Sequence, residues 1–149
     1  MEVEILSWRD LKRRAVRGFA PGTALISLGD WGSEPLDLVR SPEHTLRILC
    51  NDITPALVDL SDPRDMFRLF SREQAEQVAR FAYDHRESPI LCQCWYGSSR
   101  SAAVAAALLE HFDKRGMEVF RDERYFPNLY IFRLTLQALE GEERRRAHG

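Results

Sequence analysis

The sequence predicts an α/β fold, with a mostly parallel central sheet flanked by helices. Two observations support this prediction. Short apolar runs that suit buried strands alternate along the chain with longer segments of helical periodicity. One of these runs, Pro89–Cys92, leads through a short polar loop into an alanine-rich helix that starts at Ser101. In such a fold, binding sites lie at the carboxyl ends of the strands, so this loop is the first place to look for function.

Length and composition place the chain in a broad class. Its 149 residues suit one domain with a single core. The content of 44% apolar and 30% charged residues is that of a globular protein in water, and no apolar run approaches the length of a membrane span. A net charge of -2 argues against a general nucleic-acid binder. We expect one domain over residues 1–141, followed by a charged, flexible tail over residues 142–149.

The segments before the loop carry recognisable signals. Glu2–Leu6 begins with alternating polar and apolar residues, as in an edge strand. Ser7 suits the N-cap of a short helix over Trp8–Ala15. Ala24–Leu28 and Thr45–Cys50 are apolar enough for two further strands.

The helix before the loop is predicted by its start and by its apolar stripe. Ser71 and Gln74 form a capping-box pattern, and the helix ends near His85. Four small apolar residues follow at the spacing of one helix face: Ala75, Val78, Ala79 and Ala82.

After the loop we expect two helices. The first runs over Ser101–Arg115, is buried nearly all round in its first half, and ends at Gly116 as a C-cap. Met117–Phe120 then suits a short extended segment or a turn. Pro127 is well placed as the first residue of the final helix, which should stop at Gly141.

The loop itself has the chemistry of an anion site. A strand that feeds a helix through a short loop directs backbone N–H groups and the positive end of the helix dipole at one point. Cys94 lies at the start of this loop, where such donors should lower the pKa of its thiol. Arg100 can grip two phosphate oxygens with its planar fork. Gly97 allows a positive φ and a close approach of the backbone to an anion, and the Ser101 hydroxyl can reach the Cys94 sulfur.

The pattern Cys94-x-x-Gly97-x-Ser99-Arg100-Ser101 resembles the signature of the cysteine-dependent protein tyrosine and dual-specificity phosphatases. In element order, the chain is similar to the small bacterial-type tyrosine phosphatases. The resemblance implies a thiolate nucleophile at Cys94 and a phosphocysteine intermediate that water hydrolyses. One departure is Gln93, where the family usually has a histidine that orients the loop and lowers the thiol pKa.

The resemblance also implies roles for individual residues. Arg100 binds phosphate, Ser101 assists breakdown of the intermediate, and an aspartate protonates the leaving oxygen. Asp52 is our first candidate for this acid because it directly follows a strand, with Asp62 second and Asp59 third. Each of these aspartates taken alone is also an ordinary turn or cap residue. The loop residues expected to bind the substrate are Trp95, Tyr96, Gly97, Ser98, Ser99 and Arg100.

The implied substrate is a phosphorylated protein or a small phosphomonoester, with no nucleic-acid or membrane partner and no cofactor or metal. The loop interior has no lysine, which favours a singly phosphorylated substrate. The three cysteines do not make a disulfide framework, and the N-terminus lacks the features of a signal peptide. We therefore expect a cytoplasmic protein, in which a catalytic thiol survives.

Several alternatives remain open. The chain could be a catalytically weak phosphate-binding pseudophosphatase, which Gln93 and the choice among three acids would favour. The same chemistry could act on a phosphoinositide or an RNA end. Sulfurtransferases and arsenate reductases also use a Cys–Arg loop, but the serine after Arg100 speaks for a phosphatase. A metal site built on Cys92, Cys94 and His111 lacks the usual spacing and a fourth ligand.

Overall fold

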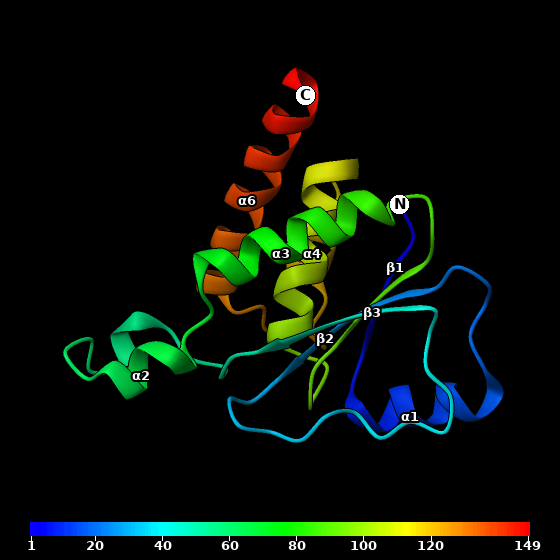
Figure 1. Cartoon of the computed structure of the whole chain (residues 1–149), viewed down its shortest axis with the longest axis horizontal. Helices are drawn as coiled ribbons and strands as arrows, with labels where there is room; N and C mark the ends of the chain where they lie inside the picture. The colour runs from blue at the N-terminus through cyan, green and yellow to red at the C-terminus, as the bar shows by residue number, and fades with distance from the viewer.

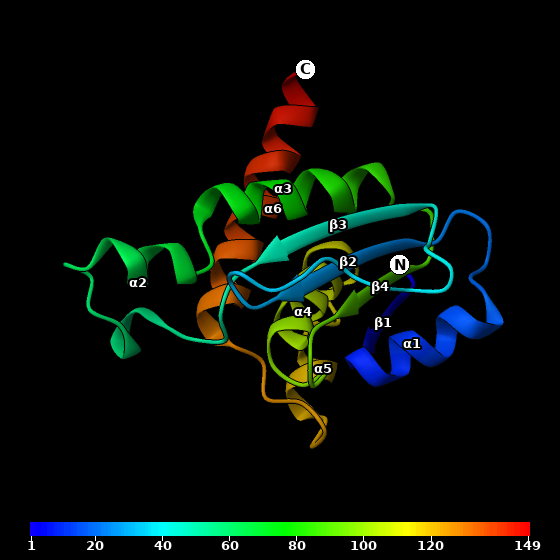
Figure 2. The same ribbon diagram turned by 60° about the horizontal axis from the view of Figure 1, so that its bottom comes forward.

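A four-stranded sheet forms the centre of the computed structural model, which describes residues 1–149. The strands are β1 (Val3–Leu6), β2 (Ala24–Gly29), β3 (His44–Leu49) and β4 (Ile90–Gln93). Their order is β1-β4-β2-β3, and every neighbouring pair is parallel. The predicted α/β fold is therefore confirmed, and the sheet is parallel throughout. All strands end at the same edge, so the loops that follow β2, β3 and β4 meet there (Figure 2).

Helices cover both faces of the sheet. Helix α1 (Trp8–Arg17) lies on one face, and α3 (Arg72–Asp84), α4 (Arg100–Asp113) and α6 (Leu129–His148) lie on the other (Figure 1). Helix α4 packs directly on β1, β4 and β2, while α6 packs against both α3 and α4. The helix that follows β4 is thus held between the sheet and another helix, which fixes its N-terminus at the end of β4.

The small residues of α4 allow this close packing. Ala102–Ala107 is fully buried, and most of these side chains belong to the main core between the sheet and the three helices. A smaller core of Leu6, Leu11, Leu25 and Leu91 joins the opposite face of the sheet to α1. Close-packed small side chains leave α4 little freedom to shift, so the end of the loop that precedes it is held in place.

The predicted helix starts are confirmed. The Ser7 hydroxyl accepts a hydrogen bond from the Asp10 N–H at 3.1 Å, as an N-cap of α1. At the start of α3 both halves of the capping box form, because Ser71 and Gln74 each accept from the other's backbone N–H.

The chain after α4 differs from the prediction in two places. Lys114, with φ of 58°, is the left-handed C-cap of α4, so the helix ends before Gly116. Gly116 instead packs closely on Glu110, where an added Cβ would lie 2.6 Å from the glutamate Cβ. The following residues form a short helix, α5 (Met117–Arg121), and not an extended segment.

The final helix also starts and ends later than predicted. Pro127 precedes it, and Asn128 is its N-cap, accepting from the Ile131 N–H at 3.0 Å. The helix continues through Gly141 to His148, so residues 142–148, which we expected to belong to a charged, flexible tail, are helical. The reason is Glu142, whose carboxylate is buried and binds arginines three and four residues along the same helix. The assignment of residues 1–141 to one phosphatase domain stays a prediction.

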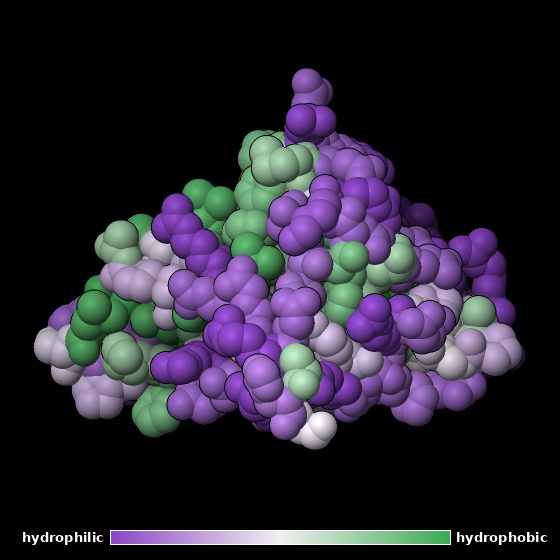
Figure 3. All heavy atoms as spheres, turned by 90° about the horizontal axis from the view of Figure 1, so that it is seen from above, coloured by the Kyte–Doolittle hydropathy of each residue, from purple (hydrophilic) through white to green (hydrophobic).

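The connection from β3 to α3 contains a 3-10 turn (Pro55–Leu57) and α2 (Pro63–Arg68), which project from the body of the molecule (Figure 1). Several large apolar side chains in this segment are exposed, including Leu57, Leu60 and Phe67. Apolar atoms therefore gather at this end of the surface, on the left of Figure 3.

None of the helices combines the length and the apolar character that crossing a bilayer requires.

Candidate active site

The loop from Cys94 to Ser101 joins the carboxyl end of β4 to the N-terminus of α4. Backbone bonds fix its first residues to the β1–α1 junction, because the Cys94 N–H donates to Leu6 O at 3.3 Å and the Trp8 N–H donates to Trp95 O at 3.1 Å. At the other side, the Phe126 N–H donates to Ser98 O at 2.8 Å. The loop is therefore tied to two separate parts of the chain, the β1–α1 junction and the segment before α6.

Gly97 is required where the loop turns. Its φ is +68°, which a residue with a Cβ rarely adopts. An added Cβ would also lie 2.5 Å from the Ser7 nitrogen. The turn that directs the loop amides inward thus depends on a glycine at this position.

The Cys94 thiol lies buried at the centre of these donors. Its Sγ is 3.1 Å from Ser101 Oγ, and the Ser101 N–H donates to it at 3.5 Å. Burial alone would raise the pKa of this thiol. The hydrogen bonds from the Ser101 hydroxyl and the Ser101 and Gly97 amides, together with the Arg100 charge, outweigh burial and lower it. The other two cysteines are free and buried, and burial raises the pKa of Cys50 to about 12.

Arg100 is buried beside the loop and held at one nitrogen. Its Nη1 donates to Asp30 Oδ1 and to Cys50 O, both at 2.8 Å. These two bonds use both Nη1 hydrogens and fix the plane of the guanidinium. Nε and Nη2 make no hydrogen bond within the protein and are not sealed from solvent. The fork that can grip two phosphate oxygens is therefore free.

Asp52 lies against the loop. Its Oδ1 accepts from Ser99 Oγ at 2.8 Å and from Asn128 Nδ2 at 3.0 Å. Asn128 also binds the backbone on both sides, because its N–H donates to Ser99 O and its Nδ2 donates to Ile53 O at 3.1 Å. Oδ2 of Asp52 makes no hydrogen bond within the protein. One carboxylate oxygen thus orients the group, and the other is left to carry a proton.

The other two candidate acids lie in the α2 segment, with contacts of their own. Asp62 caps α2, accepting from the Arg64 N–H at 2.9 Å and pairing with the Arg64 guanidinium. Asp59 accepts from the Ser61 hydroxyl at 2.6 Å and from the Ser61 N–H. Hydrogen bonds from Arg64 lower the pKa of the Asp62 carboxyl. Hydrogen bonds from Ser61 lower the pKa of the Asp59 carboxyl. Neither aspartate has a hydrogen bond to the loop, so of the three candidate acids only Asp52 is bonded to it, through Ser99.

Gln93 is buried below the loop in a polar chain. Its Nε2 donates to Cys94 O at 3.1 Å, and its Oε1 accepts from the buried Ser27 hydroxyl. Ser27 Oγ in turn accepts from Arg47 Nη1 at 2.7 Å. Both the nitrogen and the oxygen of the Gln93 amide are therefore hydrogen-bonded, and this chain of bonds links the Cys94 backbone to a guanidinium on β3.

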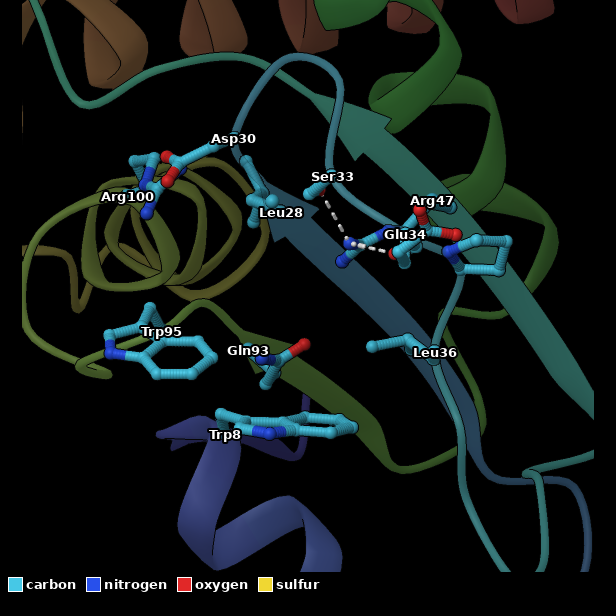
Figure 4. A pocket seen from close by; sticks show the side chains of 12 residues that line it. Trp8, Leu28, Asp30, Ser33, Glu34, Leu36, Arg47, Gln93, Trp95 and Arg100 are labelled. Carbon is cyan, nitrogen blue, oxygen red and sulfur yellow. Dashed lines mark hydrogen bonds and ion pairs between the residues drawn. The ribbon is translucent and has the colours of Figure 1, made fainter.

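A cavity of about 290 Å³ adjoins the loop on the side of α1. Trp8 and Trp95 line it with their indole rings, and Gln93 lies between them (Figure 4). Arg100 lies with Asp30 at one end of the cavity, and Arg47 lies at the other (Figure 4). Of the expected substrate-binding residues, only Trp95 and Arg100 line this cavity. Tyr96, Gly97, Ser98 and Ser99 do not, and Tyr96 is 79% exposed.

Sequence reasoning missed the residues that come to the site from β2, β3 and α1. Asp30, Arg47 and Trp8 carry no motif of their own, and only the order of the strands brings them to the loop. A usable signal existed for Asp30, which directly follows a strand that ends at the same edge as β4. No three histidine, cysteine, aspartate or glutamate side chains come together as they would around a metal ion.

No protein-family model matches this sequence, and no curated protein sequence matches it. Solved structures do. Human DUSP28 is 17% identical, with a TM-score of 0.61 over 96% of this chain and 94% of that chain. A mouse putative dual specificity phosphatase complexed with zinc tungstate is 20% identical, with a TM-score of 0.59 over 97% and 86% of the two chains. Tk-PTP in its active form is 22% identical, with a TM-score of 0.59 over 95% and 92%.

PTPMT1, solved in complex with PI(5)P, is 12% identical, with a TM-score of 0.59 over 97% of this chain and 94% of that chain. The shared feature of these structures is the fold, which is that of the dual-specificity and tyrosine phosphatases.

Proposed function

We propose that this chain, which has the fold of the dual-specificity and tyrosine phosphatases, is a phosphomonoester hydrolase that acts through a phosphocysteine intermediate. The observation that carries the proposal is the convergence on one loop of three groups. These are an acidified thiol at Cys94, a guanidinium fork at Arg100 and a carboxylate at Asp52. The substrate is a phosphorylated protein or a small phosphomonoester.

In the first step, the Cys94 thiolate attacks phosphorus and the bond from phosphorus to the leaving oxygen breaks. The loop amides and the free Nε and Nη2 of Arg100 bind the phosphoryl oxygens, where negative charge is held in the transition state. The leaving oxygen takes a proton from Asp52. The products of this step are the free alcohol and phosphocysteine.

In the second step, water attacks the phosphocysteine and loses its proton to Asp52. The sulfur–phosphorus bond breaks, and the electron pair returns to sulfur. The Ser101 hydroxyl, 3.1 Å from Sγ, donates to the departing thiolate and stabilises it. Inorganic phosphate then leaves, and the enzyme returns to its starting protonation state.

Asp52 is favoured as the acid by its contacts. Ser99 and Asn128 hold Oδ1 beside the loop, and Oδ2 is free to exchange a proton with the leaving oxygen. Asp62 and Asp59 are held in local turns of the α2 segment. A reducing compartment such as the cytoplasm suits a protein with an acidified thiol and two further free cysteines.

The test is hydrolysis of para-nitrophenyl phosphate over a range of pH, with a chelator present. We expect the wild type to hydrolyse the substrate, with a rate that falls at high pH as the acid loses its proton. We expect Cys94→Ser to be inactive and Asp52→Asn to lose this fall at high pH. Asp62→Asn is the matched control, because it removes the same group from a carboxyl outside the site, and it should keep the wild-type profile.

Two results would change the proposal. If Asp62→Asn rather than Asp52→Asn loses the high-pH fall, the acid is Asp62, and the α2 segment must move to reach the loop. If the wild type binds vanadate or phosphate but hydrolyses no phosphomonoester, the chain is a phosphate-binding module without turnover.

A further inference from the structure

Arg47 is a half-buried cation without an anionic partner. Its guanidinium donates only to neutral acceptors, which are Ser27 Oγ at 2.7 Å, Ser33 Oγ at 3.1 Å and the backbone oxygen of Glu34 at 3.2 Å. Its Nε is sealed from solvent with no acceptor. Charged groups that are taken out of water are normally paired with an opposite charge, and the Arg47 guanidinium has no such partner in contact.

The same cavity holds Arg47 and Arg100. Burial lowers the pKa of the Arg47 guanidinium, the nearby positive charge of Arg100 lowers it further, and the negative charge of Asp30 offsets this only in part. Two carboxylates also line the cavity. Asp30 is paired with Arg100, and Glu34 offers Arg47 its backbone carbonyl while the residue is exposed. The positive charge at the Arg47 end of the cavity is therefore the one that the protein does not neutralise by contact.

Arg47 is also held in place for binding. Both Nη2 hydrogens and one Nη1 hydrogen are used by its three partners, which fixes the plane of the guanidinium and leaves the other Nη1 hydrogen free. Gly29 makes room for this position, because a Cβ there would lie within 3 Å of the guanidinium carbon and both terminal nitrogens. A guanidinium that is already ordered loses little entropy when an anion binds to it.

We propose that this cavity binds a second anionic group of the substrate, a carboxylate or a phosphate, on Arg47, while the reacting phosphate lies on the loop at Arg100. This inference rests on the proposed function and names its substrate class, which is a small phosphomonoester with two anionic groups. A volume of about 290 Å³ suits a small molecule, and the indoles of Trp8 and Trp95 provide apolar surfaces for its body (Figure 4). The loop interior has no lysine, so the second cation comes from β3 and not from the loop.

The experiment measures binding to Cys94→Ser protein by calorimetry, so that it does not depend on turnover. The ligands are the ortho, meta and para isomers of carboxyphenyl phosphate, each compared with its neutral carbamoyl counterpart. We expect at least one carboxylate isomer to bind about tenfold more tightly than its counterpart, as a contact between charged groups predicts. The measure is this ratio, and not either affinity alone.

Arg47→Gln, made in the same background, should abolish the ratio. Arg121→Gln is the matched control, because Arg121 is exposed on α5, makes no side-chain contact and carries the same charge. It should keep the ratio. If Arg47→Gln fails to fold, Arg47→Lys replaces it and should keep a reduced preference, which a thermal melt checks against loss of structure.

The proposal is overturned if no carboxylate isomer binds better than its counterpart, or if the ratio survives in Arg47→Gln. It is also overturned if only a phosphopeptide with a neighbouring acidic residue depends on Arg47, because the occupant is then a protein. Failure of the proposed function looks different. In that case protein with native Cys94 hydrolyses no phenyl phosphate, whatever the ratio in the Cys94→Ser protein.

Discussion

Asp30 is the group that orients Arg100 for phosphate. Its carboxylate would repel a phosphate dianion, but we still expect its removal to weaken catalysis. The carboxylate accepts from Arg100 Nη1 at 2.8 Å, and Cys50 O accepts the other Nη1 hydrogen. In Asp30→Ala the backbone carbonyl alone remains, and the guanidinium can turn about its own stem. Its free fork then no longer faces the loop in one fixed orientation.

Two effects of the substitution oppose each other. The Arg100 side chain is 7% exposed and that of Asp30 is 67% exposed, so the pair is only partly screened by solvent. Its loss should cost about 1 kcal/mol of transition-state binding, between the values for exposed pairs and for buried charged hydrogen bonds. The substitution also removes a negative charge near the phosphate dianion, which should strengthen the binding of the phosphate. Asp30→Asn separates the two effects, because it keeps an acceptor oxygen and removes the charge.

The assay compares kcat/KM for para-nitrophenyl phosphate, and vanadate inhibition, in these two variants. We expect Asp30→Ala to lose roughly fivefold in kcat/KM, as about 1 kcal/mol implies, and Asp30→Asn to lose less. Asp37→Ala is the matched control, since Asp37 is an exposed acid in the same β2–β3 loop without a side-chain contact. If Asp30→Ala is as active as Asp37→Ala, or more active, Asp30 repels the substrate and does not position Arg100.

Two further predictions concern the loop. Gly97→Ala should lower the free energy of unfolding by more than Gly32→Ala, because both glycines have positive φ but only Gly97 would place its Cβ against backbone, whereas Gly32 faces open space. Thermal melts of the two variants measure the difference, and equal melting temperatures would show that the loop moves to accommodate a Cβ. Ser101→Ala should raise the pKa of Cys94, because burial already raises it and the hydroxyl is the strongest group that lowers it. The rate of iodoacetamide alkylation should then rise at higher pH in Ser101→Ala than in the wild type, and an unshifted profile would contradict this role for Ser101.

The sequence was sufficient for the parts of the site that are local in the chain. Strand, loop and helix from Pro89 onward are contiguous, so the apolar run, Gly97 and the alanine-rich helix together predict where the anion cradle lies. The choice of Asp52 rests on the same kind of reasoning, because it lies three residues after the end of a strand, β3. The helix ends were less predictable. A buried carboxylate at Glu142 carries α6 past Gly141, and burial of one side chain leaves no local signal in the sequence.

The cavity beside the loop could not be predicted, because it is made by the order of the strands. β2 lies between β4 and β3, which brings Asp30 from one strand end to Arg100 and sets Arg47 across Ser27 from Gln93. The position of Asp30 directly after a strand places it at the loop edge of the sheet, but nothing in the sequence pairs it with Arg100 or places Arg47 near the loop. Only the parallel pairing of three separate segments gives these side chains a common cavity.

The same geometry changes how the departure at Gln93 should be interpreted. A histidine at this position would orient the loop and add positive charge near the thiol. In this chain Gln93 orients the loop by its bond to Cys94 O, and Ser27 and Arg47 hold Gln93 in turn. The groups that lower the pKa of Cys94 are Ser101, the loop amides and Arg100, all of which lie after the nucleophile. The groups that acidify the thiol are therefore other than Gln93, and a glutamine at this position is compatible with an acidified Cys94.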